Sequence, residues 1–450
     1  MKARHPFFAS VCALAIPVAL QSMLQSSFSI VDQIMIGQLG SVSIAGVGLA
    51  GKFSSIFSVV VSAVGAVAGI MLSQYLGQRN HAEVRRSFFC NLTLAAVIGI
   101  LFTALCMLFP LPLMGLYTND PATQAAGAAY LRIIALTFLP MAGATLLSTL
   151  LRCVDQPRLP LYASIVSALL NTGLNYILIF GKCGFAPMGA EGAAIATVLS
   201  QLANLLLMIF LLLRHHAARS ALARTRGTRA GRFDWQQYLA MLLPVLVCEV
   251  LWSIGENVYA AIYGHMSTEA SAAMTLTNPV QGLVIGALCG LSQAAGVIVG
   301  KSLGTRAFDE AYAAGRRLLL YGVCGSLVLS LFVITLSPLY VRIYHVDDTV
   351  RLLTRQLLLA YAAIAPFKVL NMILGGGILR SGGRTTYVMC IDLTGTWVFG
   401  VPLGLLSAFV LHLSLPWVYF ILSLEECIRF CISLVVFRRK AWMHTLDASR

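Results

Sequence analysis

The chain has 450 residues, of which 58% are hydrophobic and only 11% are Asp, Glu, Lys or Arg. This composition lies far from that of soluble globular proteins and favours an integral membrane protein. The net charge of +14 would also suit a nucleic-acid-binding protein, but the positive-inside rule of membrane proteins explains it better. The 11 cysteines are scattered without a Cys-x-x-Cys pair, which indicates free thiols rather than a metal site or disulfides.

Apolar runs of about 18 or more residues recur along nearly the whole chain, and each can cross about 30 Å of hydrocarbon as a helix. The sequence therefore predicts an all-α integral membrane fold. We expect twelve transmembrane helices, at residues 12–37, 44–75, 88–114, 126–151, 159–181, 188–213, 236–264, 270–300, 315–340, 352–379, 385–411 and 414–437. The first run follows basic residues, as a signal peptide does, but it is too long for a cleaved signal and is predicted as the first helix.

Most of the 31 Lys and Arg residues lie in the N-terminus, in alternate loops and in the C-terminus, which would all face one side of the membrane. Cytoplasmic segments of membrane proteins carry such an excess of basic residues. We therefore expect a multi-pass protein of the plasma membrane with both termini in the cytoplasm and no nucleic-acid partner. The loop with Arg342, Arg351 and Arg355 would lie on the opposite side, and the rule does not explain it.

A segment near the N-terminus, residues 16–86, occurs a second time at a constant offset of 227 residues. The offset places Pro17 on Pro244, and it places the Leu-Gly-x-Arg motif at 76–79 on the same motif at 303–306. Repeated apolar segments are typical of carriers built from two similar halves. We predict two pseudo-symmetric six-helix lobes joined by a basic cytoplasmic linker, with lobes at 1–213 and 236–450 and the linker at 214–235.

Polar residues form a stripe on the first predicted helix. Ionisable side chains at the centre of a membrane helix cost about 2.5–3.5 kcal/mol, so they are the first candidates for function. Spacings of three and four residues place on one face Ser22, Gln25, Ser29 and Asp32. We expect this face to line the transport pathway or neighbouring helices, with Asp32 as the functional residue. The alternative is that Asp32 is a hydrogen-bonded structural carboxyl.

The fifth predicted helix carries Asn171 and Asn175, which are one turn apart and share a face. Both are candidates for binding the substrate or a coupling cation. Pairs of Asn also hold membrane helices together without any further role, and this alternative stays open.

Most intramembrane acids lie in the second half. Glu249 and Glu256 are seven residues apart on the seventh helix and share a face. On the eleventh helix, Asp392 shares a face with Thr385 and Thr396. We predict a coupling or substrate-binding role for Glu256, Glu249 and Asp392.

The twelfth predicted helix carries two adjacent acids, Glu425 and Glu426, just before Arg429. A Glu and an Arg four residues apart can neutralise each other, which favours a structural role for Glu425. Glu426 can reach the same Arg from three residues away, so which carboxyl is free stays open. We keep Glu426 as a candidate site residue.

These acids suggest a mechanism of exchange. A carboxyl group held away from water can bind a proton and release it when an organic cation or Na⁺ arrives, so that export of one is tied to entry of the other. Residues 296–302 imitate a phosphate-binding loop, but the spacing is one residue short and an apolar span precedes it. Without a nucleotide site, transport must draw on an ion gradient or on a partner protein. We expect coupling to an ion gradient and no enzyme activity; an integral-membrane enzyme is the alternative from a different class.

Over essentially its whole length the chain resembles the multidrug and toxic compound extrusion (MATE) transporters. The most specific likeness is the run from Pro17 to Gly40, with Val31-Asp32-Gln33 before Gly37, where the family places a functional Asp. The Leu-Gly-x-Arg helix endings and the pair Asn171 and Asn175 are also similar to the family pattern.

The resemblance implies two V-shaped lobes that rock about a central cavity and export organic cations by alternating access, coupled to entry of H⁺ or Na⁺. It implies no cofactor, a bacterial inner-membrane location, and partners limited to small cationic molecules and membrane lipids; we also expect a monomer. Some members have Asp where Asn175 stands here, which leaves Asp32 as the only acid of the first-half cavity. That difference favours protons over a complete Na⁺ site near Asp32.

The main alternative within the same superfamily is a flippase for lipid-linked sugars. Such flippases usually have a basic cavity that suits pyrophosphate lipids. The intramembrane charges of this sequence are mostly acidic, which counts against that function.

Overall fold

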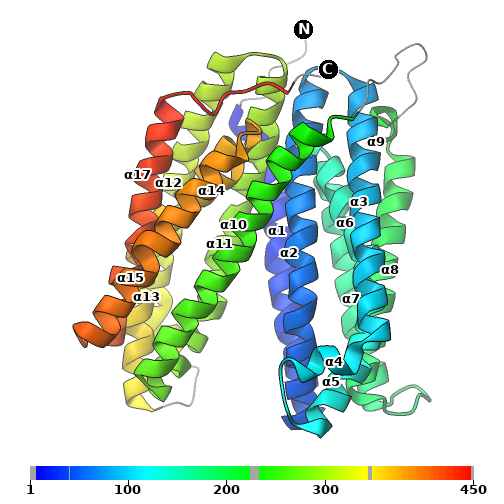
Figure 1. The fold of residues 1–450 in the computed structure, drawn as a ribbon, viewed down its shortest axis with the longest axis vertical. Coiled ribbons are helices and arrows are strands. Elements are labelled where there is room, and N and C mark those ends of the chain that lie inside the picture. Colours follow the sequence, from blue (N-terminus) through cyan, green and yellow to red (C-terminus); the bar gives the residue numbers. More distant parts are fainter. Residues whose placement is uncertain (1–6, 40, 223–232, 343–346, 447–450) are drawn as a thin grey trace. The chain divides into compact units, whose positions relative to one another are not determined.

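The structure, a computed structural model, describes residues 7–39, 41–222, 233–342 and 347–446 (Figure 1). Within these ranges all regular secondary structure is helical, and 11 helices are long and apolar enough to cross a membrane. The twelfth predicted span is present as two consecutive helices, α16 (Leu415–Ser423) and α17 (Glu425–Arg438). The prediction of an all-α integral membrane fold is confirmed.

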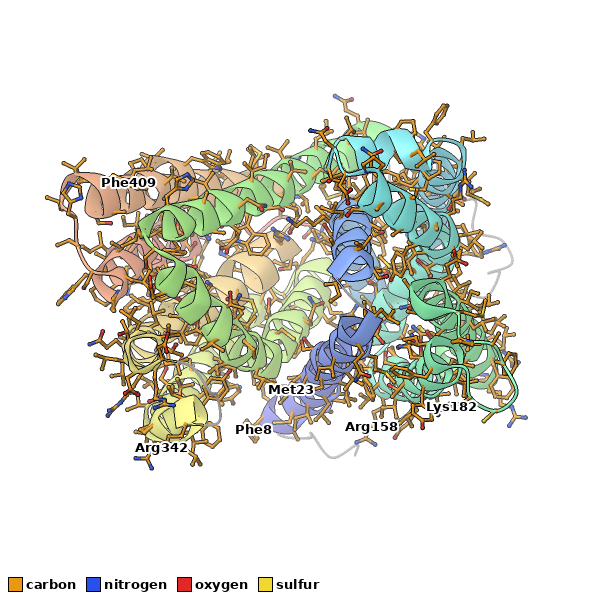
Figure 2. The ribbon with its side chains drawn as sticks, turned by 90° about the horizontal axis from the view of Figure 1, so that it is seen from below. Phe8, Met23, Arg158, Lys182, Arg342 and Phe409 are labelled. Atoms are coloured by element: carbon orange, nitrogen blue, oxygen red, sulfur yellow. The ribbon has the colours of Figure 1, made fainter. Side chains whose placement is uncertain are left out.

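The helices follow the predicted spans closely. The first half contains α1 (Phe7–Ile36), α2 (Ser41–Gly77), α3 (His81–Leu108), α4 (Pro110–Gly115), α5 (Pro121–Ile134), α6 (Phe138–Cys153), α7 (Arg158–Phe180) and α8 (Gly189–Arg214). The linker begins with a short helix, α9 (His216–Ala221), and its residues 223–232 lie outside the described part of the chain. Arg158 and Lys182, labelled in Figure 2, place a basic side chain at each end of α7.

The second half has the same order of long helices. It contains α10 (Trp235–Met266), α11 (Thr268–Gly304), α12 (Phe308–Arg342), α13 (Asp348–Asn371), α14 (Thr385–Leu393) and α15 (Val401–Leu405). Three π-helical segments interrupt what the sequence predicted as regular helices in the described part of the second half: η3 (Met372–Leu379) follows α13, η4 (Thr394–Gly400) follows α14, and η5 (Leu406–Val410) follows α15. Wider π turns occur often at functional sites. Of these segments, η4 directly follows the helix that carries the predicted site residue Asp392.

The repeat of the sequence is reproduced in the structure. Helices α2 and α11 have 37 residues each, and both ends of α11 lie 227 positions after those of α2. Beyond each helix the Arg of the Leu-Gly-x-Arg motif takes a left-handed conformation, with φ of 56° at Arg79 and 58° at Arg306. A left-handed residue stops an α-helix because it turns the backbone out of the helical path. The motif therefore ends the same helix in both halves.

Packing divides the described chain into two compact units. One contains α1 up to Ala19, the end of α2 (Ser73–Gln78), and the helices from α10 onward. The other contains the rest of α1 and α2 together with α3 to α9. This grouping follows packing rather than position in the sequence. The lobe boundaries at 1–213 and 236–450 stay a prediction.

In the first of these units, the ends of α2 and α11 approach each other so closely that only glycine fits. A Cβ on Gly77 would lie 2.2 Å from the backbone oxygen of Lys301, and a Cβ on Gly304 would lie 2.1 Å from that of Gln74. The two contacts are related by the repeat, because Gln74 corresponds to Lys301 and Gly77 to Gly304. The motif glycines are therefore required by a close backbone crossing, whereas the motif arginines form the helix stops.

The C-terminal segment covers this crossing. The Gln74 side chain is fully buried and donates to the backbone oxygen of Ser381 at 2.7 Å, while its own oxygen accepts from the backbone N–H of Leu446 at 2.7 Å. Nearby, Trp442 is fully buried and stacks on Phe437. Because buried polar groups need such partners, the segment and the crossing depend on each other.

Candidate functional site

In the unit that contains α7 and α8, one polar cluster brings three predicted site residues together. The Asn175 amide donates a short hydrogen bond to the Asp32 carboxylate and another, of 3.2 Å, to the side-chain oxygen of Asn171. The Asn171 amide in turn donates to Thr197 at 3.3 Å and to Ser200 at 3.4 Å, both on α8. Asp32 is thus linked across three helices, and the one-turn spacing of the two Asn residues allows both to take part.

The buried side of this cluster is incompletely satisfied. Asn175 is fully buried, and its side-chain oxygen has no hydrogen-bond partner among the described residues. That oxygen and the nearby Asp32 carboxylate are acceptors that suit a proton donor or a hard cation. Of the residues that the structure describes, no three His, Cys, Asp or Glu are arranged to hold a metal ion. A proton bound to Asp32 needs fewer protein ligands than a metal cation bound at the same place.

Two other predicted site residues of the α1 stripe, Gln25 and Ser29, have no described contact with this cluster. The Gln25 side chain is exposed, and the Ser29 side chain lies outside the described part of the structure. One turn earlier, Gln21 donates to Ser164 at 2.9 Å. The predicted stripe therefore brings Asp32 into the described cluster, while a role for Gln25 and Ser29 stays a prediction.

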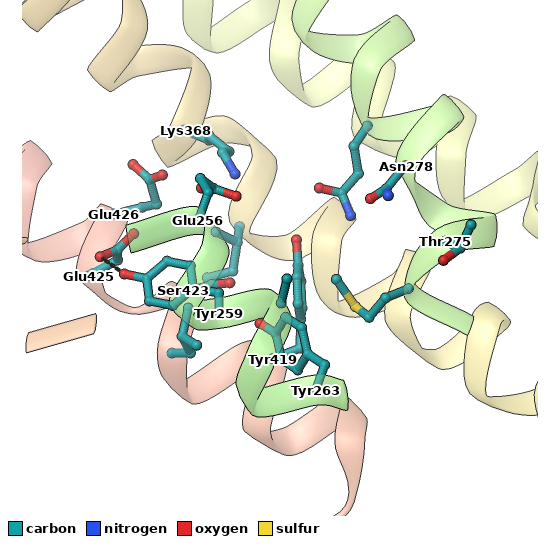
Figure 3. A pocket seen from close by; sticks show the side chains of 15 residues that line it. Glu256, Tyr259, Tyr263, Thr275, Asn278, Lys368, Tyr419, Ser423, Glu425 and Glu426 are labelled. Atoms are coloured by element: carbon teal, nitrogen blue, oxygen red, sulfur yellow. Dashed lines mark hydrogen bonds between the residues drawn. The ribbon is translucent and has the colours of Figure 1, made fainter. Parts of the chain in front are cut away.

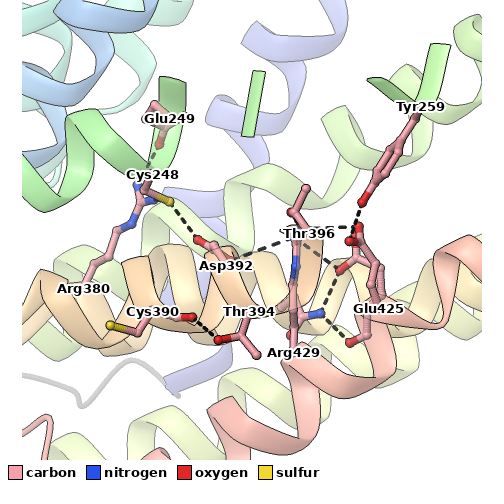
Figure 4. Close-up of polar contacts among 12 residues, drawn as sticks. Cys248, Glu249, Tyr259, Arg380, Cys390, Asp392, Thr394, Thr396, Glu425 and Arg429 are labelled. Atoms are coloured by element: carbon pink, nitrogen blue, oxygen red, sulfur yellow. Dashed lines mark hydrogen bonds and ion pairs between the residues drawn. The ribbon is translucent and has the colours of Figure 1, made fainter. Parts of the chain in front are cut away.

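The other unit contains a larger charged network, which is centred on Arg429 of α17 (Figure 4). Its guanidinium lies 3.3 Å from Glu425, 4.0 Å from Glu426 and 3.9 Å from Asp392, and it donates a short hydrogen bond to Thr396. Arg429 is only 6% exposed. The predicted pairing within α17 is present, and the guanidinium also neutralises the acid of α14.

The network continues from Asp392 to α10. The Cys248 thiol donates to Asp392 at 2.9 Å, and Arg380 donates to Glu249 at 3.1 Å and to the Cys248 sulfur at 3.6 Å (Figure 4). On the sequence alone, Arg380 belonged with the basic residues of a cytoplasmic loop. In the structure its side chain is only 15% exposed and is held by an acid that is itself a predicted site residue.

Two further side chains hold the acids of α17. The Tyr259 hydroxyl donates to Glu425 at 2.6 Å. The Asn371 amide donates to the Glu426 carboxylate at 2.8 Å. Neither Glu is therefore free, because Arg429 lies near both, and each has a second donor.

Two cavities adjoin this network. The first has a volume of about 300 Å³ and is walled mainly by acids, tyrosines and amides (Figure 3). Its polar lining includes Glu256, Tyr259, Tyr263, Asn278, Gln281, Lys368, Tyr419, Glu425 and Glu426. The second has a volume of about 260 Å³, and its lining includes Cys248, Glu249, Trp252, Lys368, Asn371, Arg380, Asp392, Glu426 and Arg429. Together they bring four predicted site residues to one region, namely Glu249, Glu256, Asp392 and Glu426.

Comparison with known proteins identifies the family. The MatE family model matches residues 17–177 and 244–406, which is one match in each half of the chain. The chain belongs to the MatE family. A probable multidrug resistance protein NorM from Thermotoga maritima is 24% identical over 435 residues, which cover 95% of this chain and 92% of that protein. The expected family is therefore confirmed.

Solved structures of MATE transporters have the same fold, with twelve transmembrane helices in two pseudo-symmetric lobes. A MATE crystal structure in complex with MaL6 superposes with a TM-score of 0.86 at 17% identity, covering 97% of this chain and 96% of that one. A MOP superfamily transporter from Pyrococcus furiosus has a TM-score of 0.84 at 16% identity, and its binding pocket is described as having reversed polarity. The fold alone therefore leaves the charge of the cargo undecided.

Besides Arg380, Arg429 and Glu425, the cavities of this MatE protein contain a further charged residue that was not among the predicted site residues, namely Lys368 on α13. Its side chain lines both cavities. A signal was present, because Lys368 is the only Lys or Arg between Arg355 and Arg380 and therefore interrupts the tenth predicted span. A basic residue inside an apolar span is as strong a functional candidate as an acidic one.

We expect the stability of the protein to depend strongly on Arg429, the centre of the charged network. Replacing it with Met will leave buried carboxylates without their counter-charge, and removing one partner of a buried ion pair costs about 3–5 kcal/mol. Thermal unfolding of the detergent-solubilised protein measures the loss. The matched control is Arg439→Met, at an exposed position just beyond α17, which will unfold close to the wild type. Equal stability of the two variants would contradict the neutralising role of Arg429.

Proposed function

We propose that this MatE protein is a secondary active exporter of amphiphilic organic cations that works by alternating access and antiport with protons. The observation that carries the proposal is the charge of the two cavities. Five carboxylates line them, against three basic side chains. An excess of negative charge in a site of low dielectric attracts a cation and repels an anion.

The first-half cluster supports protons as the coupling ion. Asp32 accepts a hydrogen bond from a neutral amide, and no basic side chain pairs with it among the described residues. Its carboxyl group can therefore be neutralised by a proton, which needs no further ligands. The neighbouring residue is Asn175 rather than a second acid, which reduces the negative charge available to hold Na⁺.

The same charges support a drug-like cation over a lipid-linked sugar. A pyrophosphate lipid carries negative charge and would need basic residues without acidic partners. Two of the three basic residues, Arg380 and Arg429, are paired with carboxylates. The tyrosines of the first cavity add aromatic faces, which attract organic cations. Relatives named multidrug resistance proteins are consistent with such cargo.

The proposed setting is the inner membrane of a bacterium, with a monomer as the working unit and both termini in the cytoplasm. The positive-inside distribution of Lys and Arg supports this orientation. The same orientation sets the direction of transport, because protons that enter the cytoplasm down their gradient would drive the export of organic cations.

Proton coupling is tested in proteoliposomes loaded with the fluorescent cation ethidium. We expect rapid efflux when the outside is more acidic than the lumen, and none when an inward Na⁺ gradient is imposed at equal pH. Liposomes without protein give the background. Efflux driven by Na⁺ alone would refute proton coupling, and absence of efflux under both gradients would refute the export of this class of cation.

A further inference from the structure

Lys368 stands apart from the other basic residues of the two cavities. It lies in α13, one turn before the π-helical segment η3, and it lines both cavities together with Glu426. Arg380 and Arg429 each donate to a carboxylate. Lys368 makes no hydrogen bond and no ion pair with any described residue. Its ammonium therefore lies inside the protein, faces the cavities and has no fixed partner among the described residues.

The acid opposite this ammonium is also unpaired. Glu256 lines the first cavity and has no hydrogen bond or ion pair among the described residues. Lys368 lines the first cavity together with Glu256, and it lines both cavities together with Glu426. Figure 3 shows these three side chains gathered on one side of the cavity. An unpaired ammonium and an unpaired carboxylate thus share a space large enough for a small molecule.

The rest of the wall suits a cation that carries an apolar body. Tyr259, Tyr263 and Tyr419 line the cavity next to Glu256. Aromatic faces attract a cation within about 6 Å, and they also cover apolar groups. A ligand that offers an ammonium to Glu256 and its rings to the tyrosines would therefore occupy the region toward which Lys368 points.

We propose that Lys368 is a competitor of the cargo: across the empty cavity its ammonium offsets part of the negative charge of Glu256 without a direct contact, and it moves away when an organic cation binds. The side chain of Lys is a flexible stem with a compact charge, so it can move without a change of backbone. The second cavity gives the displaced ammonium a place among Glu249, Asp392 and Glu426. This step deepens the proposed function and rests on its assignment of a cationic cargo.

The competition has a consequence for selectivity. A small inorganic cation would be attracted only by the negative charge of Glu256. The ammonium of Lys368 already provides a positive charge near this carboxylate, so such a cation gains little by binding. An organic cation gains the tyrosine faces in addition, so it can displace the ammonium. Removal of the competitor will therefore strengthen binding of the cargo rather than weaken it, which is the opposite of what loss of a structural residue does.

Ethidium binding to the purified, detergent-solubilised protein at fixed ionic strength tests the proposal. We expect Lys368→Met and the polar Lys368→Gln to bind ethidium on the order of tenfold more tightly than the wild type, because one unit charge near the cation is removed. Lys368→Arg keeps the charge and will bind like the wild type. Adding Glu256→Gln to Lys368→Gln will remove the gain.

The outcomes separate the two proposals. If neither neutral variant binds more tightly than the wild type, although both remain folded and the wild type exports ethidium, the competitor role of Lys368 is wrong and the proposed function stands. The competitor role is equally wrong if both neutral variants fail to fold, because Lys368 is then a structural counter-charge. If the wild type neither binds nor exports ethidium, both proposals fail.

Discussion

Asp32→Asn will abolish proton-driven efflux of ethidium while the protein still inserts and folds. The Asn side chain has nearly the same shape, and its oxygen can still accept the hydrogen bond from Asn175. It cannot exchange a proton, so the coupling step is lost although the cluster of α1, α7 and α8 keeps its contacts. The efflux rate of proteoliposomes under an inward proton gradient is expected to fall to that of empty liposomes.

The matched control for this substitution is Asp120→Asn. Asp120 caps the exposed start of α5, where its carboxylate accepts from the backbone N–H of Thr123 at 3.0 Å. Asn caps a helix about as well as Asp, so this substitution removes a carboxylate but keeps the cap and leaves the transport pathway unchanged. Efflux by Asp32→Asn at the rate of this control would remove Asp32 from the mechanism.

Gly304→Ala will prevent accumulation of folded protein, because the added Cβ would lie 2.1 Å from the backbone oxygen of Gln74. Neither partner can turn away, since the obstacle is the main chain at a helix crossing rather than the end of a flexible side chain. Overpacking a core usually costs about 1–3 kcal/mol, and this contact lies well below any normal van der Waals distance. Yield and the unfolding midpoint after detergent extraction measure the effect.

The same helix provides the control for this change. Gly282 of α11 has no atom within 4 Å of the position that a Cβ would take. Gly282→Ala will be neutral or slightly stabilising, because Ala is the better helix former. Gly77→Ala is expected to behave like Gly304→Ala, since the repeat relates the two contacts. If Gly304→Ala were as stable as Gly282→Ala, the close crossing would be wrong.

The number and order of the membrane-spanning helices could largely be predicted, because they depend on local and periodic features of the sequence. Apolar runs of membrane-spanning length predict the helices, since a chain in lipid must satisfy its backbone internally. The repeat at an offset of 227 predicts equal ends for α2 and α11, and the structure has them. The π-helical segments η3, η4 and η5 were not predicted, because hydropathy is the same in a π-helix and an α-helix.

The site could be predicted only in part. Helical spacing brought Asn171 and Asn175 to one face, and the cost of burying charge selected Asp32, Glu256 and Asp392. Their hydrogen-bond partners could not be predicted from the sequence, because Asp32 and Asn175 are 143 positions apart and Cys248 and Asp392 are 144 positions apart. Arg380 was assigned to a loop because the tenth predicted span ends at residue 379, and its partner Glu249 on α10 could not be seen from the sequence.

The sequence by itself determined that this protein is a membrane-embedded carrier of two related halves with acids inside its spans. Composition, periodicity and the cost of charge in lipid are properties of the chain alone. Only the tertiary structure decided which charges cancel and which stay free. Arg429 lies near three carboxylates, whereas Lys368 and Glu256 face a cavity without fixed partners among the described residues. Pairing depends on which helices pack together, and side chains far apart in sequence meet only there.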